Sequence, residues 1–150
     1  MSSHTAAGTT IGISATAPTT YNKTGWNALV ATTIGEVTDL GQFGREYADV
    51  THKPLASRAT IHKKGSYDEG VVSLSFALDS KDAGQILLNT ASKSDSDYYF
   101  VITDTQSGDK WYFPAQVRTF KRNYGSVDNI VTVTSDLQIT GTGVFEDLAP

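Results

Sequence analysis

The sequence predicts a mainly β protein, a β-sandwich or small barrel of about seven strands with one flanking α-helix. Of the 150 residues, 20 are Thr and 14 are Ser, and only 19% are charged, so hydroxyl groups replace much of the usual surface charge. Thr favours strands. Residues 69–79 and 127–141 alternate apolar and polar side chains with period two, and only residues 80–91 show convincing helical spacing. A chain of this length corresponds to one domain.

The first 20 residues differ in composition from the rest of the chain. They hold 15 Ser, Thr, Ala or Gly residues and no Asp, Glu, Lys or Arg. Such a segment buries too little apolar surface to order itself, so we expect residues 1–20 to form a flexible arm that becomes ordered on assembly. Ile11 and Ile13 alternate with small residues, which suits a strand added to the sheet edge of another subunit. Residues 21–150 are expected to form a single domain.

The domain is expected to open with two strands. Residues 26–37 are rich in β-branched side chains, which suits a strand that follows a short turn at residues 23–25. A second strand-like stretch covers residues 45–51.

A long basic loop is predicted next. Residues 52–66 contain Pro54 and Gly65 and have no clean period over their first half. This pattern predicts a long loop, about residues 44–66, or an irregular hairpin. Between positions 45 and 64, five basic residues face only two acidic ones. The candidate contact residues of this loop are Arg45, Asp49, His52, Lys53, Arg58, His62, Lys63 and Lys64.

The middle of the chain predicts a strand followed by the helix. In residues 69–79 the apolar side chains share one parity and the small or polar side chains share the other, which indicates a half-buried strand. Residues 80–91 have apolar side chains three and four positions apart, with Ser80 as the expected N-cap. The helix is therefore expected to pack against the sheet.

The last third of the chain predicts a hairpin and a final strand. Residues 98–105 and 110–122 are strand-like and are joined by a turn at residues 106–109. Pro114 indicates an edge position or a bulge in the second arm. Residues 127–141 alternate again, with apolar side chains on one parity and hydroxyl, amide and carboxylate side chains on the other.

The composition argues against several classes of function. There is no Cys, no apolar run long enough for a transmembrane helix, and no nucleotide-binding or hydrolase motif. The three histidines have no metal-ligand spacing, so we expect no metal, no cofactor and no enzymatic activity. The net charge of −4 argues against adhesive binding to nucleic acid, although it permits nucleic acid to slide past.

Six aromatic residues gather on the predicted hairpin. An aromatic platform can stack sugars or bases, whereas cross-strand aromatic pairs over a core are the ordinary interpretation. Both interpretations remain open from the sequence. The six residues are Tyr98, Tyr99, Phe100, Trp111, Tyr112 and Phe113.

Read in order, short motifs cover nearly the whole chain, from about residue 20 to about residue 145. They are Trp26 with Ile34-Gly35, Asp49-Val50-Thr51, Asp68-Glu69-Gly70-Val71-Val72, Asp82-Ala83-Gly84-Gln85 with Ile86-Leu87-Leu88, Val127-Asp128-Asn129, and Leu137, Ile139 and Gly141. In this order and spacing, with the aromatic hairpin between, the chain resembles the major tail tube proteins of long-tailed bacteriophages, of the siphovirus kind.

The resemblance implies a structural virion protein. Members of that family form hexameric rings that stack into a hollow tail tube, which conducts DNA from the capsid to the host cell. The implied partners are further copies of the chain, a tape measure protein, tail-tip and tail-terminator proteins, and DNA in transit without specific binding, with no membrane. The implied location is the phage tail, assembled in the bacterial host cytoplasm.

The polar parities of the two alternating strands suit the lumen of such a tube. The loop around residues 44–66 and the N-terminal arm would bridge neighbouring subunits and rings. Two alternatives stay open: a type VI secretion-like tube protein, and a monomeric β-sandwich carbohydrate-binding module. The candidate lumen residues are Glu69, Ser73, Ser75, Thr132, Thr134 and Asp136.

Overall fold

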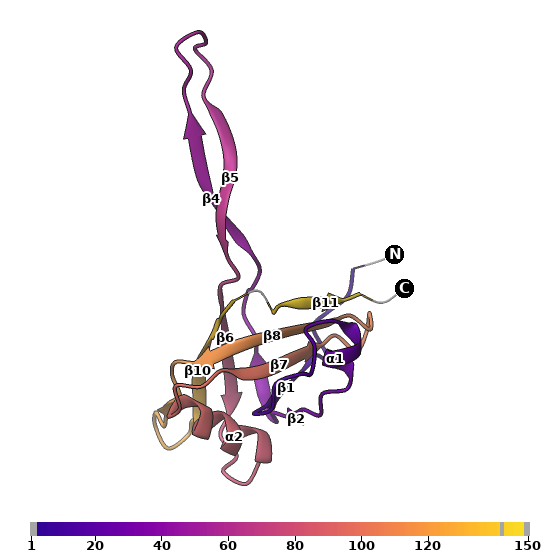
Figure 1. Cartoon of the computed structure of the whole chain (residues 1–150). Helices are drawn as coiled ribbons and strands as arrows, with labels where there is room; N and C mark the ends of the chain where they lie inside the picture. The colour runs from indigo at the N-terminus through magenta and orange to yellow at the C-terminus, as the bar shows by residue number, and fades with distance from the viewer. Residues whose placement is uncertain (1–2, 142, 149–150) are drawn as a thin grey trace.

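The two period-two segments of the sequence lie side by side in one curled, antiparallel sheet (Figure 1). The computed structural model describes residues 3–141 and 143–148, so residues 1–2 of the predicted arm and 142, 149 and 150 of the predicted domain lie outside the described residues. The sheet order is β2-β1-β7-β8-β10-β6-β3, with β9 paired to β10 and β11 paired to β8. The strands are β1 Thr10–Ser14, β2 Thr32–Thr33, β3 Val37–Asp39, β6 Val71–Ala77, β7 Tyr98–Thr103, β8 Lys110–Val117, β9 Lys121–Asn123, β10 Thr132–Ile139 and β11 Phe145–Asp147.

The alternation predicted for β6 and β10 is confirmed. Val72, Leu74 and Phe76 are buried on β6, and Val133, Leu137 and Ile139 are buried on β10, while the other parity of each strand is exposed or half-buried. Ser135 also points into the core, where its hydroxyl donates to the carbonyl of Thr119 at 2.7 Å. The predicted fold class, mainly β with a flanking helix, is therefore correct.

The helix α2, Ala83–Ser92, begins later than predicted. Its N-cap is Asp82 rather than Ser80, because the Asp82 carboxylate accepts hydrogen bonds from the backbone N–H of both Gln85 and Gly35. The buried Gln85 side chain donates in turn to the carbonyls of Gly35 and Ala77. These bonds fasten the start of α2 to the linker before β3 and to the end of β6, which a helical period cannot reveal.

The segment predicted as a strand over residues 26–37 is largely a different structure. A short helix, α1, spans Lys23–Asn27, with the Asn22 side chain accepting from the Gly25 N–H as its N-cap. Only Thr32–Thr33 and Val37 of the predicted stretch lie in strands. The prediction was wrong because local capping and the burial of Trp26 override the β-branched composition.

The segment expected to be a free arm contains a strand of this chain's own sheet. Ile11 and Ile13 lie in β1, between β2 and β7, and both are fully buried in the core. The prediction that Ile11 and Ile13 form a strand only on the sheet edge of another subunit is therefore corrected. The physical reason is long-range pairing: β1 meets β7 some ninety residues later, which composition within a 20-residue window does not show.

Pro114 lies within β8 at a position where the neighbouring strand changes. Residues 110–112 of β8 pair with β11 and residues 115–117 pair with β10, so Pro114 falls between the two ladders. Its missing N–H therefore interrupts neither of these ladders. This refines the expectation of an edge or a bulge.

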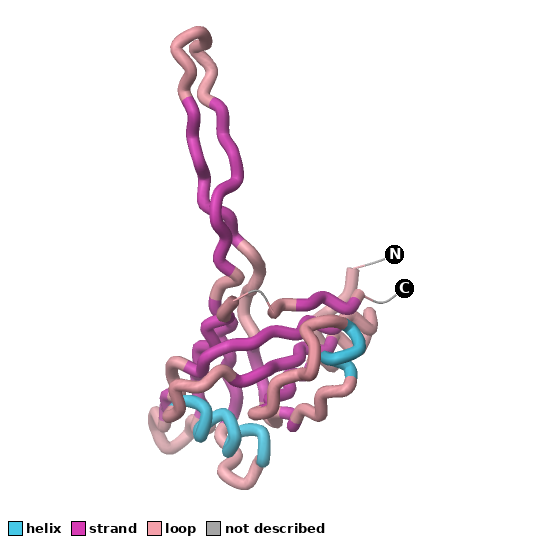
Figure 2. Tube along the Cα trace, in the orientation of Figure 1, coloured by secondary structure: helices cyan, strands magenta, loops and turns pink. Residues whose placement is uncertain are grey.

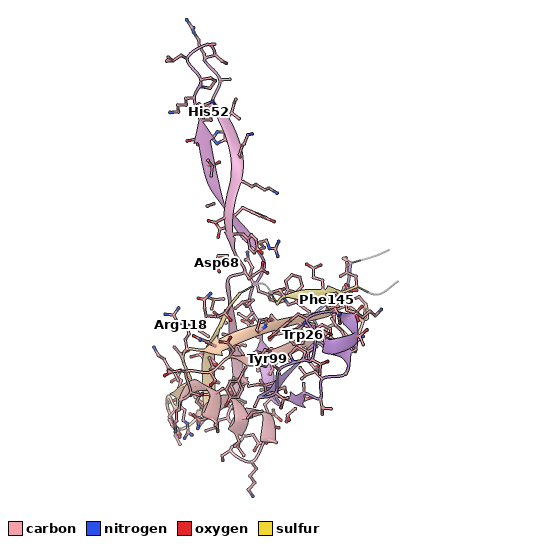
Figure 3. The ribbon with its side chains drawn as sticks, viewed as in Figure 1. Trp26, His52, Asp68, Tyr99, Arg118 and Phe145 are labelled. Atoms are coloured by element: carbon pink, nitrogen blue, oxygen red, sulfur yellow. The ribbon has the colours of Figure 1, made fainter. Side chains whose placement is uncertain are left out.

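An aromatic cluster closes the end of the sheet beside α1 (Figure 3). The fully buried Trp26 ring stacks on Tyr112 at 5.4 Å between centroids and contacts Tyr99 and Tyr21 at 6.1 and 5.7 Å. Burial, helped by a hydrogen bond with Tyr21, raises the pKa of Tyr99 to about 12. Burial also raises the pKa of Tyr112.

We expect the stability of the protein to fall as the pH rises above the ordinary tyrosine pKa of about 10. The native state keeps the Tyr99 proton up to about pH 12, whereas the unfolded chain loses it near pH 10, so the stability present below pH 10 is lost through that window. When tyrosinate formation is followed by ultraviolet absorbance, a fraction of the tyrosines should ionise at a higher pH than an ordinary tyrosine does. Tyr99→Phe should remove part of it, and Tyr124→Phe, at an exposed ring, should not.

Candidate assembly surfaces

The basic segment of the sequence forms a hairpin that stands away from the sheet (Figures 1 and 2). β4, Glu46–His52, pairs antiparallel with β5, Ile61–Asp68, with a register shift between Tyr47 and Asp49. All of β4 is exposed, and in β5 only Gly65 is half-buried. Because β4 follows β3 and β5 precedes β6, the hairpin prolongs the β3–β6 pair beyond the sheet. An isolated two-stranded hairpin is marginally stable in water, so this one is a candidate contact surface.

The hairpin concentrates positive charge at its far end. Residues 50–66 hold four of the chain's 12 basic residues and none of its 16 acidic ones. Lys53 and Arg58 lie in the exposed turn, and His52 lies close to it (Figure 3). The apolar side chain of Leu55, at the tip, is fully exposed. The remainder of the chain is strongly acidic, so the molecule is electrostatically polarised.

The other predicted loop residues line the shaft of the hairpin. His62 Nδ1 lies 2.9 Å from Asp49 Oδ2 across the two strands, and both side chains are exposed. The Lys64 ammonium lies 4.8 Å from the centre of the Tyr47 ring. Lys63 faces Val50 across the ladder. The structure therefore brings seven of the eight predicted residues onto one projecting element.

The eighth, Arg45, fastens the base of the hairpin to the sheet. Its Nε donates to the Glu69 carboxylate, its Nη1 donates to the Tyr47 hydroxyl at 3.2 Å, and its guanidinium carbon lies 4.0 Å from the centre of the Tyr67 ring. The hydrogen bonds to Tyr47 and Glu69 raise the pKa of Arg45, so the guanidinium stays charged. Gly44 and Gly70, on the two sides of this contact, both have positive φ angles, of 153° and 92°.

The assignment of Glu69 to a polar lumen face is corrected by this contact. Glu69 lies between β5 and β6, is 5% exposed, and pairs with Arg45 of the same chain. A buried carboxylate needs a charged or hydrogen-bonding partner, and Arg45 supplies it. Glu69 is therefore a positioning residue at the base of the hairpin.

We expect Glu69→Gln to loosen the base of the hairpin without unfolding the sheet. The amide keeps the shape of the side chain but removes the charge that holds the Arg45 guanidinium. Hydrogen exchange should become faster at the amides of residues 44–46 and 70, with unchanged exchange in β10. The matched control is Asp49→Asn, on the exposed shaft, which should leave the base unchanged. Unchanged exchange at the base in Glu69→Gln would contradict this role.

The remaining five predicted lumen residues come together on one face of the β6–β10 pair. Ser75 lies opposite Thr134, and Ser73 lies opposite Asp136, whose Oδ1 accepts a hydrogen bond from the Ser73 hydroxyl at 3.1 Å. Each of the five is exposed or half-buried. They make a face of small hydroxyls with one carboxylate. The five are Ser73, Ser75, Thr132, Thr134 and Asp136.

Sequence reasoning did not identify β3 and β9, the two short strands that flank this face, as separate strands. Only Val37 of β3 lay in a predicted strand, and Lys121 and Arg122 of β9 were included in the strand predicted over residues 110–122. It did not predict that the turn after β9 exposes large apolar side chains: Tyr124, Val127 and Ile130 are 57%, 98% and 76% exposed. The available signal was the presence of large apolar residues within a Gly-, Asp- and Asn-containing turn. Apolar side chains that stay exposed in an isolated chain indicate a contact surface.

The aromatic hairpin does not form an exposed platform. Phe100 and Phe113 are opposite each other in the β7–β8 ladder, fully buried and stacked at 5.4 Å. Tyr112 is buried on Trp26, and the half-buried Trp111 packs on Phe43 at 5.4 Å. Cross-strand packing over a core is the observed arrangement, and it does not support a carbohydrate-binding module.

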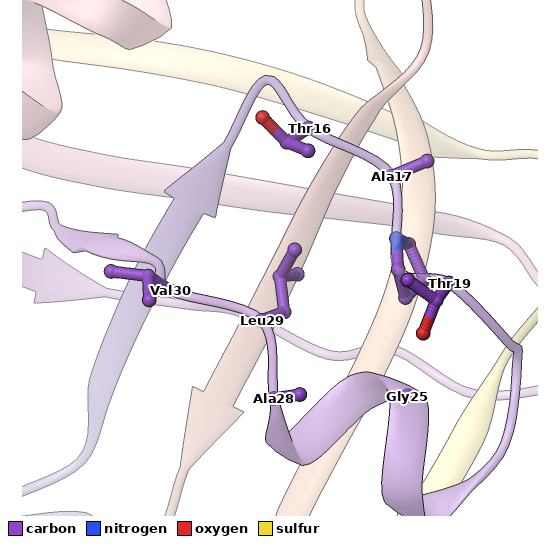
Figure 4. A pocket seen from close by; sticks show the side chains of 8 residues that line it. Thr16, Ala17, Thr19, Gly25, Ala28, Leu29 and Val30 are labelled. Carbon is purple, nitrogen blue, oxygen red and sulfur yellow. The ribbon is translucent and has the colours of Figure 1, made fainter.

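A pocket of about 310 Å³ lies between α1 and the chain after β1 (Figure 4). Its lining contains hydroxyl and apolar side chains and no titratable group. Among the described residues, no group of three or more His, Asp or Glu side chains is placed to hold a metal ion. No helix within residues 3–141 and 143–148 has the length and apolar content that a membrane crossing requires. The lining residues are Thr16, Ala17, Pro18, Thr19, Gly25, Ala28, Leu29 and Val30.

The curled sheet, the flanking helix and the projecting hairpin together define a tail-tube-like fold. No protein-family model matches the chain, and no curated protein matches it. Among the solved structures that share the fold are a prophage baseplate chain and a phage tail tube chain. A chain of the anti-feeding prophage baseplate, in a six-fold symmetrised cryo-EM structure, aligns with a TM-score of 0.65 and 9% identity over 97% of both chains. The SPP1 tail tube aligns with a TM-score of 0.63 and 14% identity over 94% of this chain and 77% of that one.

Proposed function

We propose that this chain is a structural subunit of a phage tail, and that its hexameric rings stack into a hollow tube that conducts DNA from the capsid to the host cell. The β4–β5 hairpin is the observation that carries the proposal. It is exposed on both faces and extends from the β3–β6 pair along the strand direction. A contact with another copy would supply the burial that the hairpin lacks within its own chain.

Charge supports stacking between copies. The far half of the hairpin is purely basic, and the rest of the chain carries all 16 acidic residues. A contact between the basic hairpin of one copy and an acidic surface of the next joins two different patches. Such a contact can be repeated from copy to copy along one axis, which gives a filament. Each exposed ion pair contributes only ~0–1 kcal/mol, but every subunit of a ring repeats the contact.

The polar face of β6 and β10 suits a conduit. Its hydroxyls and the Asp136 carboxylate present no cluster of cations to bind phosphate, so DNA would pass without adhering. One chain of the anti-feeding prophage baseplate has the same fold as this protein, and that baseplate structure is six-fold symmetrised. This symmetry supports rings of six. The role is structural: the partners would be copies of the chain, a tape measure protein, and tail-tip and terminator proteins, in a tail assembled in the host cytoplasm.

The test is particle size against concentration. Light scattering on a sizing column, with negative-stain images of the same fractions, should show rings or tubes with a central hole. Their abundance should rise with subunit concentration and fall with salt, because screening weakens exposed charge contacts. A monodisperse monomer at every concentration and at low salt would contradict the proposal.

A further inference from the structure

The outer part of the β4–β5 hairpin, residues 50–66, carries positive charge alone. It holds four of the chain's 12 basic residues, Lys53, Arg58, Lys63 and Lys64, and none of its 16 acidic ones. The net charge of −4 therefore describes the chain as a whole and not this segment, because all 16 acidic residues lie elsewhere. Several cations gathered on one exposed element are the electrostatic footprint of a site for a polyanion.

Distance separates this outer hairpin from the acidic body. The hairpin stands away from the sheet (Figure 1). From Glu46 to His52, β4 alone rises about 20 Å, at roughly 3.3 Å per residue. Exposed charges are largely screened from one another beyond about 10 Å at an ionic strength of about 0.1 M. The carboxylates of the body therefore repel an anion at the tip of the hairpin only weakly.

The four cations lie on both faces of the hairpin and at its tip. Successive side chains of a strand point to opposite faces, so Lys63 and Lys64 of β5 lie on opposite faces. Lys53 and Arg58 lie in the exposed turn that joins β4 to β5. An anion with two charged walls could therefore be contacted on both sides at once.

The carboxylate on the shaft does not neutralise these cations. Asp49 lies opposite Lys64 in the ladder, but its Oδ2 lies 2.9 Å from His62 Nδ1, across the two strands. Among the residues that the structure describes, Lys53, Arg58 and Lys63 form no ion pair. At least three of the four cations are thus free to bind an anion from outside the chain.

The thickness of the hairpin matches the major groove of B-form DNA. Packed sheets lie about 10 Å apart, which is the thickness of one sheet with its side chains. The major groove is about 12 Å wide and admits a two-stranded β-ribbon, whereas the minor groove is only about 6 Å wide. A hairpin that enters tip first places cations beside the phosphates of both DNA strands. The fully exposed Leu55 at the tip can contact thymine methyl groups on the groove floor.

We infer that the outer hairpin binds double-stranded DNA in the major groove while the subunit is free. This inference goes beyond the proposed function and does not depend on it. The polar face of β6 and β10 is not part of this site, so DNA inside a tube would still pass without adhering. In stacked rings the next copy would cover the same hairpin, so DNA binding and stacking exclude each other.

The test measures the fluorescence anisotropy of a labelled DNA duplex of about 20 base pairs with the full chain, at subunit concentrations below those at which light scattering detects assembly. The logarithm of the affinity should fall with the logarithm of the salt concentration with a slope of about 3 to 4, because four cations each release about 0.9 counterion. Lys53→Ala with Arg58→Ala should lower that slope by about 2 and weaken binding about tenfold or more in dilute salt.

Two further variants complete the comparison. Lys63→Ala with Lys64→Ala repeats the test on the two faces of the shaft and should lower the slope by about the same amount. The matched control, Lys81→Ala with Lys93→Ala, removes two exposed cations beside α2 and should bind DNA as the unmodified chain does. Circular dichroism checks that each variant is folded. If both hairpin variants bind DNA as tightly as the unmodified chain, the inference is overturned.

Two other polyanions separate groove binding from simple charge attraction. An RNA duplex of the same length carries the same phosphates, but its major groove is deep and narrow, so it should bind at least about fivefold more weakly. Polyglutamate has the charge and no groove, and it should also bind more weakly. Equal binding of the RNA duplex would overturn the groove assignment. Equal binding of polyglutamate would overturn the inference and identify an acidic protein surface as the partner.

Discussion

Joining Glu46 to Asp68 through a two-residue Asn-Gly turn is expected to abolish tube assembly and to leave the body folded. Glu46 and Asp68 are directly opposite in the β4–β5 ladder, so a two-residue turn fits between them. The removed residues, 47–67, pair mainly with one another and are almost all exposed. Thermal melting by circular dichroism should therefore change little, while negative-stain images should show no stacked rings.

A milder variant separates charge from shape in the same hairpin. Arg58→Glu with Lys63→Glu keeps the hairpin and reverses part of its charge, so assembly should become slower and its salt dependence should change. Asp95→Lys, in the loop after α2, is a control for charge at an unrelated exposed position. Stacked tubes from the shortened chain would show that the hairpin is not the contact between rings.

The largest loss of stability is expected from Phe100→Ala. The ring is fully buried at the centre of the core and stacks on Phe113, which lies opposite it in the neighbouring strand. Deleting a buried aromatic ring costs about 3–5 kcal/mol through lost burial and the cavity that remains. In a chain of this size that should lower the melting temperature by roughly 10 °C.

The control for that loss is Tyr124→Ala, which removes an aromatic ring that is 57% exposed in the turn after β9. Its effect on the unfolding free energy of the monomer should stay within about 0.5 kcal/mol. Urea unfolding of both variants measures the difference. Equal losses would show that the described core is not the one that stabilises the protein.

Much of the sheet could be predicted because its central strands are half-buried. Alternation in β6 and β10 reports burial directly, since side chains on successive residues point to opposite faces. The same alternation identified the five polar residues that now lie together on one face. The basic segment was also recognised, because a run of residues without acidic partners is visible in the sequence alone.

Two of the errors share one cause, which is contact between distant parts of the chain. The small, uncharged residues around Ile11 and Ile13 indicate flexibility, yet β7 lies beside them and orders them as β1. Glu69 follows the polar pattern of its neighbours, yet it is buried against Arg45, 24 positions earlier in the chain. Neither contact can be recognised from the composition of the residues that are close to it in the sequence.

The sequence by itself determined the strand periods, the single long helix and the separation of basic from acidic residues, because burial and charge are properties of each side chain and its near neighbours. Only the tertiary structure decided that β3 and β9 end up at opposite edges of one polar face. It also decided that the basic segment stands out as a hairpin instead of folding back. Those outcomes depend on strand order and register, which are settled by hydrogen bonds and packing between residues far apart in the chain.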